Sequence, residues 1–516
     1  MGRFKLVLLV LALQTIFIVA YSYQIDPLLV SKYIVNGEST PSFYPNDVEN
    51  TTKVDYGLGP NEITDLGLKN MNKMGKVTKK ELSVDRNIIP TFYDPKYVFT
   101  RGMSEQKTIY SAYSYLLGMF PHSINGVDFK SELMDDGETI PLKYLDNIRK
   151  RSGMDNRLCK NRTLQYYGGN RDYEFIESHF DQYPSLKYKM LKNLQDAKVI
   201  FEREYGNELY ETMSRTMRID TDRLDFYNSI DYLEDYVTAK YNKKKTPYHF
   251  DESTDLLIEV YYTHYFKLGI FKDPAILRVF THSYFVNLAK EMLLKSQVDQ
   301  ESIYVGLANE NIDTMGLSLH FGNQITFLAI MHQINTLEQY FPSYGDELSW
   351  TLYKKRGEYW VFGEYDDEKL NLESKANSMG EISLDRFITY ICSKVYFGDI
   401  KKVLRGEEDP DDFLDSPHNC KQFFENHYTF EEELLQTRID PYSFQQDDSN
   451  LIDVNKHCSL IDDEPKVIEK PAKKPKTFRN VTQIIHEVQV PITATNPYPS
   501  ELSYNPYNPY YHNDWD

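Results

Sequence analysis

The hydrophobic pattern of this chain changes twice along its length, and that order constrains the fold more than any single motif. Two strand-loop-helix units come first, at residues 26–74 and 97–117. Helical spacing then dominates from residue 172 to about 295, and segments of strand type return from residue 302 onward. Strands that alternate with helices are typical of an α/β sheet, and a helical stretch between two such parts indicates an insertion. We therefore predict an α/β body that is interrupted by a helical cap.

Individual elements follow from local patterns. Residues 26–34 predict a strand that ends in a loop before Pro41. Tyr97 to Thr100 predict a second strand, Arg101 to Met103 a loop, and Ser104 the N-cap of the next helix. Aromatic and β-branched residues predict further strands at 302–307, 347–354 and 387–397. One helical stripe predicts core packing and consists of Leu277, Phe280, Tyr284, Leu288 and Met292.

The N-terminus has the layout of a signal peptide. Basic residues precede an apolar run at residues 6–20, and small residues flank a cleavage point after Ser22. The alternative is an uncleaved membrane anchor, because the run is borderline in length for a bilayer. We expect a lumenal or extracellular protein of the secretory pathway, with an organelle membrane as the alternative. The predicted parts are 1–22 (signal peptide or anchor), 23–171 (first half of the body), 172–300 (helical cap), 301–461 (second half) and 462–516 (tail).

Candidate modification sites and the cysteine count agree with a location in the secretory pathway. Candidate glycosylation acceptors are Asn50, Asn161 and Asn480. The four cysteines permit two disulfides in three pairings, and their spacing fits neither a zinc site nor a redox motif; they are Cys159, Cys392, Cys420 and Cys458.

Charge excludes one class of function. The formal net charge is -19 and the isoelectric point is near 5.2, so the chain has no excess of basic residues to neutralise a phosphate backbone. We therefore expect no nucleic-acid partner.

The tail from residue 462 carries a charged, proline-containing run and three Asn-Pro-Tyr repeats that begin at Asn496, Asn505 and Asn508. Such a segment is typical of disorder or of an extended strip that binds a protein partner. A membrane partner is expected only if the N-terminal segment is retained.

Two short phrases mark the first unit. Residues 35–41 read Val-Asn-Gly-Glu-Ser-Thr-Pro, and residues 63–67 read Ile-Thr-Asp-Leu-Gly. Their order resembles the histidine acid phosphatase family, in which Arg-His-Gly-x-Arg-x-Pro ends the first strand and Leu-Thr-x-x-Gly opens the next helix. Gly37, Thr40 and Pro41 match that pattern. The family's arginine, histidine and second arginine are replaced by Val35, Asn36 and Ser39.

Two later phrases extend the resemblance. Arg101 stands where the family has a phosphate-binding arginine, and the helix residues Thr108, Ser111 and Ala112 also match. The family's third element is a strand that ends in a His-Asp pair before a helix. In the preferred register Asn311 takes the place of the histidine and Ile312 that of the aspartate. A slip of one residue offers a carboxylate from Glu310 or Asp313 instead.

The resemblance also implies a disulfide. Residues 416–420, Ser-Pro-His-Asn-Cys, are similar to a family segment Cys-Pro-His-x-Cys, and Cys159 stands where the family has a cysteine after its early strands. It therefore implies a bond between Cys159 and Cys420. Cys392 lies in an apolar segment and is interpreted as a buried free thiol.

The resemblance implies a phosphoglycerate-mutase-like α/β sandwich with a helical cap, but not the family's chemistry. That chemistry needs an imidazole nitrogen that attacks phosphorus and arginines that stabilise the transferring group. Of the six family positions only Arg101 is kept, and asparagine has no nucleophilic nitrogen. The remaining histidines lack metal-ligand spacing, so no metal and no cofactor is expected.

Three functions follow as hypotheses. The first is an inactive, phosphatase-like protein that serves as a binding or structural component in the secretory pathway or in a membrane-associated complex. The second is a divergent acid phosphatase that hydrolyses phosphomonoesters with a substitute residue. The third is an anchored accessory subunit of an organelle membrane complex.

Overall fold

The computed structural model describes most of the body and cap. The described residues are 26–42, 57–94, 96–103, 105–121, 127–130, 164–168, 184–241, 249–299, 315–335, 341–365, 368–370, 372, 380–404, 406–413 and 420–426. All of them belong to the larger of two compact units, residues 1–468. The smaller unit, residues 469–516, contains no described residue.

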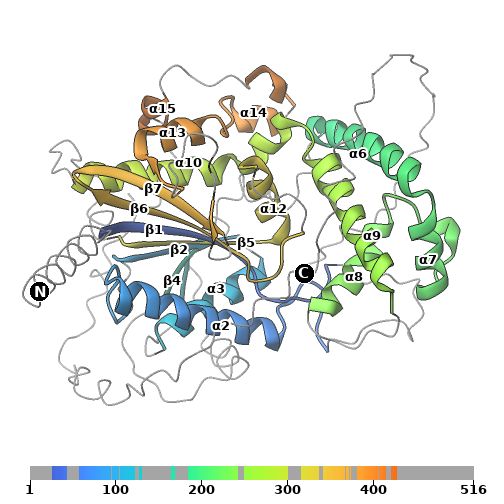
Figure 1. Cartoon of the computed structure of the whole chain (residues 1–516), viewed down its shortest axis with the longest axis horizontal. Helices are drawn as coiled ribbons and strands as arrows, with labels where there is room; N and C mark the ends of the chain where they lie inside the picture. The colour runs from blue at the N-terminus through green and yellow to red at the C-terminus, as the bar shows by residue number, and fades with distance from the viewer. Residues whose placement is uncertain are drawn as a thin grey trace, which may run out of the picture. The chain divides into compact units, whose positions relative to one another are not determined.

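A sheet that has nine strands within the described residues forms the centre of the larger unit (Figure 1). The strand order is β3-β4-β2-β5-β1-β6-β7-β8, and β9 pairs with β7. The strands from β3 to β1 run parallel, and those from β6 onward are antiparallel to their neighbours. Their bounds are β1 Asp26–Val35, β2 Val98–Gly102, β3 Val127–Lys130, β4 Leu164–Gly168, β5 Leu317–Gly322, β6 Glu347–Lys355, β7 Glu358–Tyr365, β8 Glu368–Lys369 and β9 Ile382–Ser383.

Helices cover both faces of this sheet (Figure 1). One face carries α2 (Asp65–Lys79), which continues as a short π-helix η2 (Lys80–Asp85), and α3 (Gln106–Met119). The other face carries α10 (Pro274–Asp299), α12 (Gln324–Gln333), α13 (Leu384–Cys392) and α15 (Cys420–Asn426), and α14 (Ile400–Leu404) lies near the cap. Two 3-10 turns are η4 (Thr221–Arg223) and η7 (Pro410–Phe413).

The cap lies beside the sheet. It consists of α6 (Pro184–Tyr205), α7 (Glu208–Met217), α8 (Ser229–Tyr241), α9 (Glu252–Tyr262) and the π-helix η5 (Thr263–Ile270). The helical insertion predicted at residues 172–300 therefore contains these cap helices and also α10, which packs on the sheet through β1.

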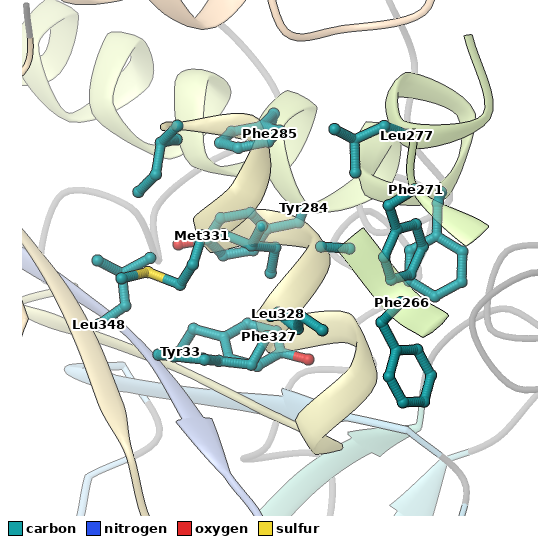
Figure 2. Packing of buried hydrophobic residues seen from close by; sticks show 14 of the residues in the cluster. Tyr33, Phe266, Phe271, Leu277, Tyr284, Phe285, Phe327, Leu328, Met331 and Leu348 are labelled. Atoms are coloured by element: carbon teal, nitrogen blue, oxygen red, sulfur yellow. The ribbon is translucent and has the colours of Figure 1, made fainter. Parts of the chain in front are cut away.

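Each face of the sheet has its own core, because successive residues of a strand point to opposite faces. On β1, Val30 and Ile34 join the cluster with α2 and α3, whereas Tyr33 and Val35 join the larger cluster with α10, α12 and the cap. Figure 2 shows this larger cluster, in which Tyr33 lies beside Phe327.

Glycines let α2 and α3 approach closely. A Cβ atom on Gly75 would lie 1.9 Å from the carbonyl oxygen of Tyr115, and one on Gly118 would lie 2.0 Å from that of Asn72. Only glycine fits at such backbone contacts. The two helices therefore pack as a close pair against one face of the sheet.

Several element predictions are confirmed and one is wrong. The strands predicted at 26–34, 97–100 and 347–354 are β1, β2 and β6, although Arg101 belongs to β2 rather than to a loop. The five-residue stripe predicted for core packing is buried on α10. The strand predicted at 387–397 is wrong, because the apolar residues that begin at Leu384 and Phe387 repeat at helical spacing and form α13. Ser104 and the segment 302–307 lie outside the described residues.

The predicted disulfide is also wrong. Cys420 is bonded to Cys392, with the two Cα atoms 5.8 Å apart. The reason is the helical form of the segment around Cys392: α13 packs against α15, and Cys420 is the first residue of α15. Cys392 is consequently not a free thiol, and Cys159 and Cys458 lie outside the described residues.

Candidate functional site

Three parallel strands end together at one edge of the sheet. Val35, the last residue of β1, pairs with Gly322 of β5, and Gly102 of β2 pairs with Phe321. The backbone amide of Asn36 donates a hydrogen bond of 2.8 Å to the carbonyl of Gly322, which ties the loop after β1 to the end of β5. Ligands of open α/β sheets bind at such carboxyl ends. We call this edge the strand-end site, formed by residues 35–42, 101–103, 105–108 and 321–324.

The loop after β1 keeps its scaffold. The amide of Gly37 donates to the Ser111 hydroxyl of α3 at 2.9 Å, and a Cβ atom on Gly37 would lie 2.8 Å from the carbonyl oxygen of Gly67. The Thr40 hydroxyl donates to the carbonyl of Gly59 at 2.7 Å. These residues, which match the family pattern, each hold the loop in place.

The substituted residues of this loop make local contacts. Val35 is fully buried in the larger core cluster. Asn36 is 1 % exposed, and its Nδ2 donates to the Gly37 carbonyl at 2.8 Å. Ser39 is also 1 % exposed, and its hydroxyl lies 3.5 Å from the hydroxyl of Tyr344.

Arg101 is placed at the same edge. It lies one residue before the end of β2, in register with His320 of β5 on one side and Tyr167 of β4 on the other. The structure therefore brings Arg101 to the edge that carries Val35, Asn36 and Ser39. The two other predicted positions, Asn311 and Ile312, lie outside the described residues.

The end of β5 is a part of the site that sequence reasoning missed. β5 lies between β1 and β2 and ends directly before α12, whose N-cap Asn323 accepts a hydrogen bond from the amide of Thr326 at 2.8 Å. This strand-to-helix junction favours Phe321, Gly322 and Asn323 as the counterpart of the family's His-Asp element. The sequence signal was the alternation of Leu317, Leu319 and Phe321 with polar residues, followed by Gly322 and a capping asparagine.

The space beside Gly322 is occupied by the side chain of Tyr33. A Cβ atom there would lie 1.7 Å from the hydroxyl oxygen of Tyr33. Tyr33 is 4 % exposed, and its ring lies 5.4 Å from that of Tyr284 and 5.8 Å from that of Phe327 (Figure 2). The phenol of Tyr33 on β1 thus fills the space beside Gly322 at the end of β5.

His320, two residues before that end, is held in a buried polar cluster. Its Nε2 lies 3.0 Å from the Ser318 hydroxyl and 3.3 Å from a carboxylate oxygen of Glu291 on α10. The same carboxylate accepts hydrogen bonds from Ser318 at 2.7 Å and from Ser31 at 3.1 Å. The imidazole therefore stabilises the contact between α10 and the sheet, and none of these partners belongs to the strand-end site.

A second cation stands at the strand-end site. Lys107, in the first turn of α3, is 12 % exposed, and its ammonium lies 3.5 Å from the carboxylate of Glu105. Burial alone lowers the pKa of Lys107, but Glu105, Tyr344 and Glu234 outweigh it, and the pKa is raised above its ordinary value. Lys107 is therefore charged and is balanced by neighbouring carboxylates.

Three further findings concern a hollow away from this edge, metal binding and membrane-spanning helices. A hollow of about 430 Å³ is lined by α6 residues such as Lys189 and by the acidic segment 406–411, and it does not include the strand ends. Within the described ranges, no group of three or more His, Cys, Asp or Glu side chains is placed to hold a metal ion. The same ranges contain no helix that is long and apolar enough to cross a bilayer.

Comparisons with known proteins identify what the chain is similar to. No protein-family model matches it. A putative acid phosphatase of Caenorhabditis elegans is 32% identical over 109 residues, which is 20% of this chain and 25% of the relative, so the match spans about a quarter of that relative's length. The phytase of Citrobacter braakii superposes with a TM-score of 0.51 at 12% identity, and the Hafnia alvei phytase in complex with tartrate with a TM-score of 0.51 at 11% identity. Each superposition covers 72% of this chain and 98% of the phytase.

Proposed function

Because this chain has the histidine acid phosphatase fold and is related in sequence to a putative acid phosphatase, we propose that it is a non-catalytic protein of that fold, which serves as a binding or structural component. The observation that carries the proposal is the end of β5. There the phenol of Tyr33 occupies the space beside Gly322, so no acid can be presented at this position.

The loop after β1 supports the same conclusion. Family-type hydrolysis needs a nucleophilic imidazole nitrogen, and the amide nitrogen of Asn36 is a hydrogen-bond donor that is already used by the Gly37 carbonyl. Removing one oxyanion-type donor from an enzyme costs on the order of 3 kcal/mol of transition-state stabilisation. Two family arginines are replaced here by Val35 and Ser39, both of them buried.

The proposed setting is the secretory pathway. The bond between Cys392 and Cys420 fits an oxidising compartment, where structural disulfides persist. In this proposal the N-terminal segment 1–22 is the export signal, Asn50, Asn161 and Asn480 carry glycans, and the tail from residue 462 binds a protein partner. Sequencing the mature N-terminus tests the export step: a start after Ser22 supports it, and retention of Met1 or Gly2 supports the anchored alternative.

An activity assay tests the central claim. The purified protein and its Arg101→Ala variant are incubated with an aryl phosphate and with phytate at acid pH, after circular dichroism has shown that both are folded. We expect no release of phosphate above the uncatalysed background in either protein. Release by the unaltered protein that disappears in Arg101→Ala overturns the proposal and favours the divergent phosphatase.

A further inference from the structure

The first turn of α3 holds an ion pair where the strand-end site would receive an anion. Glu105 is the N-cap residue of α3, but its side chain makes no capping hydrogen bond and instead lies 3.5 Å from the Lys107 ammonium. Asp and Asn at this position usually accept a bond from the helix backbone. The Glu105 carboxylate is therefore used for the lysine rather than for the helix.

Hydrogen bonds place Lys107 next to the loop after β1. The Ser111 hydroxyl donates to the carbonyl of Lys107 at 2.6 Å and accepts from the amide of Gly37 at 2.9 Å. Gly37 follows Asn36, so the backbone of Lys107 is linked through Ser111 to the residue next to the position at which the resemblance puts the family's nucleophile.

The cap supplies a second carboxylate. Glu234 of α8 accepts a hydrogen bond of 3.0 Å from the amide of Ser42, three residues after Ser39. Tyr344 joins the same two parts of the chain, because its hydroxyl lies 3.5 Å from the Thr238 hydroxyl of α8 and 3.5 Å from that of Ser39. Glu234 is near enough to raise the pKa of Lys107, as Glu105 does.

We propose that Glu105 and Glu234 take the electrostatic place of a bound anion beside Lys107, and that these two carboxylates make the strand-end site reject phosphate monoesters. This inference deepens the proposed non-catalytic function by naming the residues that set the selectivity of the site. A phosphate dianion that approached Lys107 would meet two negative charges in a partly buried environment, where charges are poorly screened. The repulsion offsets the attraction of Lys107.

A binding experiment with inorganic phosphate as the probe tests it. The Glu105→Gln/Glu234→Gln variant keeps the size of both side chains and removes both charges. Calorimetry should show phosphate binding at least about tenfold tighter than in the unaltered protein, since the Lys107 ammonium is then available for a charge-assisted hydrogen bond to phosphate. Adding Lys107→Met to this variant should abolish the gain.

A matched control separates the local effect from net charge. Glu208→Gln/Glu211→Gln removes two exposed carboxylates from the first turn of α7 and should leave phosphate binding unchanged. The inference is overturned if the control gains as much, if the folded Glu105/Glu234 variant gains nothing, or if the unaltered protein already binds as tightly. If the double variant does not fold, the single variants carry the test, and no gain in either overturns it. Phosphate binding without turnover leaves the proposed function intact, so the two claims fail separately.

Discussion

The loops after β1 and β5 meet at one edge of the sheet but differ in what they keep. The loop after β1 retains Gly37 and Thr40, and both make contacts that hold it against α2 and the segment before it. The end of β5 retains the strand-to-helix geometry, but Gly322 leaves room for the hydroxyl of Tyr33. Backbone positions are kept at both places, whereas Val35, Asn36 and Ser39 stand where the resemblance puts an arginine, a histidine and a second arginine.

This difference shows that the fold and the chemistry depend on separate residues. Scaffold glycines are fixed by backbone contacts that no other residue permits, so their loss would cost stability directly. At the end of β5, by contrast, the space beside Gly322 is filled by the side chain of Tyr33 from another strand. Tyr33 and Gly322 are therefore complementary in size, so a larger residue at one position requires a change at the other.

The largest effect is expected at the scaffold. Gly67→Ala would put a Cβ atom 2.3 Å from the carbonyl oxygen of Glu38, a backbone atom that cannot move without shifting the whole loop. We expect the free energy of unfolding to fall by roughly 2–3 kcal/mol, as measured by urea denaturation. Gly59→Ala is the control, because its Cβ would meet only the movable carboxylate of Glu62 at 3.0 Å. An equal loss in both variants would contradict the role given to Gly67.

The next effect concerns the packing of Tyr33 on Gly322. Gly322→Ala should cost roughly 2 kcal/mol, because the added methyl group overlaps the phenol. Tyr33→Leu should cost a similar amount by leaving a cavity beside Phe327 and Tyr284. In a double-mutant cycle Gly322→Ala should cost less than about 1 kcal/mol in the Tyr33→Leu background, where the phenol is gone. Additive losses would show that the two positions do not compete for space.

The sequence predicts the first of these loops and not the second, for a physical reason. Gly37, Thr40 and Pro41 stand at a local spacing that can be read along the chain, and their contacts follow from that spacing. The state of Gly322 depends on Tyr33, which is distant in sequence and becomes a neighbour only through the parallel pairing of β1 with β5. The pairing of Cys392 with Cys420 was missed for the same reason, since it depends on how α13 and α15 pack.

The helix after β5 also gives this unit a dependence on pH. Burial, with the nearby charge of Lys267, lowers the pKa of His332 on α12 from 6.5 to about 4, although a hydrogen bond with the backbone of Phe271 opposes the shift. The unfolded chain binds a proton below the ordinary pKa while the folded chain does not, so stability is complete above about pH 6.5 and is lost as the pH falls toward 4.

We expect this loss to be about 1 kcal/mol between roughly pH 7 and pH 5, after allowance for the partial exposure of the ring. Urea denaturation at both pH values measures it. His332→Gln should show a smaller loss on acidification, and His249→Gln, at an exposed position, serves as the control. A steeper loss in His332→Gln would contradict the assignment.

The smallest effect is expected from Asn36→His, the substitution that restores the residue type of the family's nucleophile. A ring nitrogen of the new histidine could still donate to the Gly37 carbonyl as Nδ2 does now. In the proposed non-catalytic protein the new imidazole would find no acid at the end of β5, because Tyr33 occupies the space at Gly322, and Val35 is fully buried where the family has an arginine. Catalytic groups that act as a unit give little when one is present alone. We therefore expect phosphate release from an aryl phosphate by Asn36→His to stay at the background of the unaltered protein. Turnover by Asn36→His that is lost on adding Arg101→Ala would show that hydrolysis does not need an acid at the end of β5.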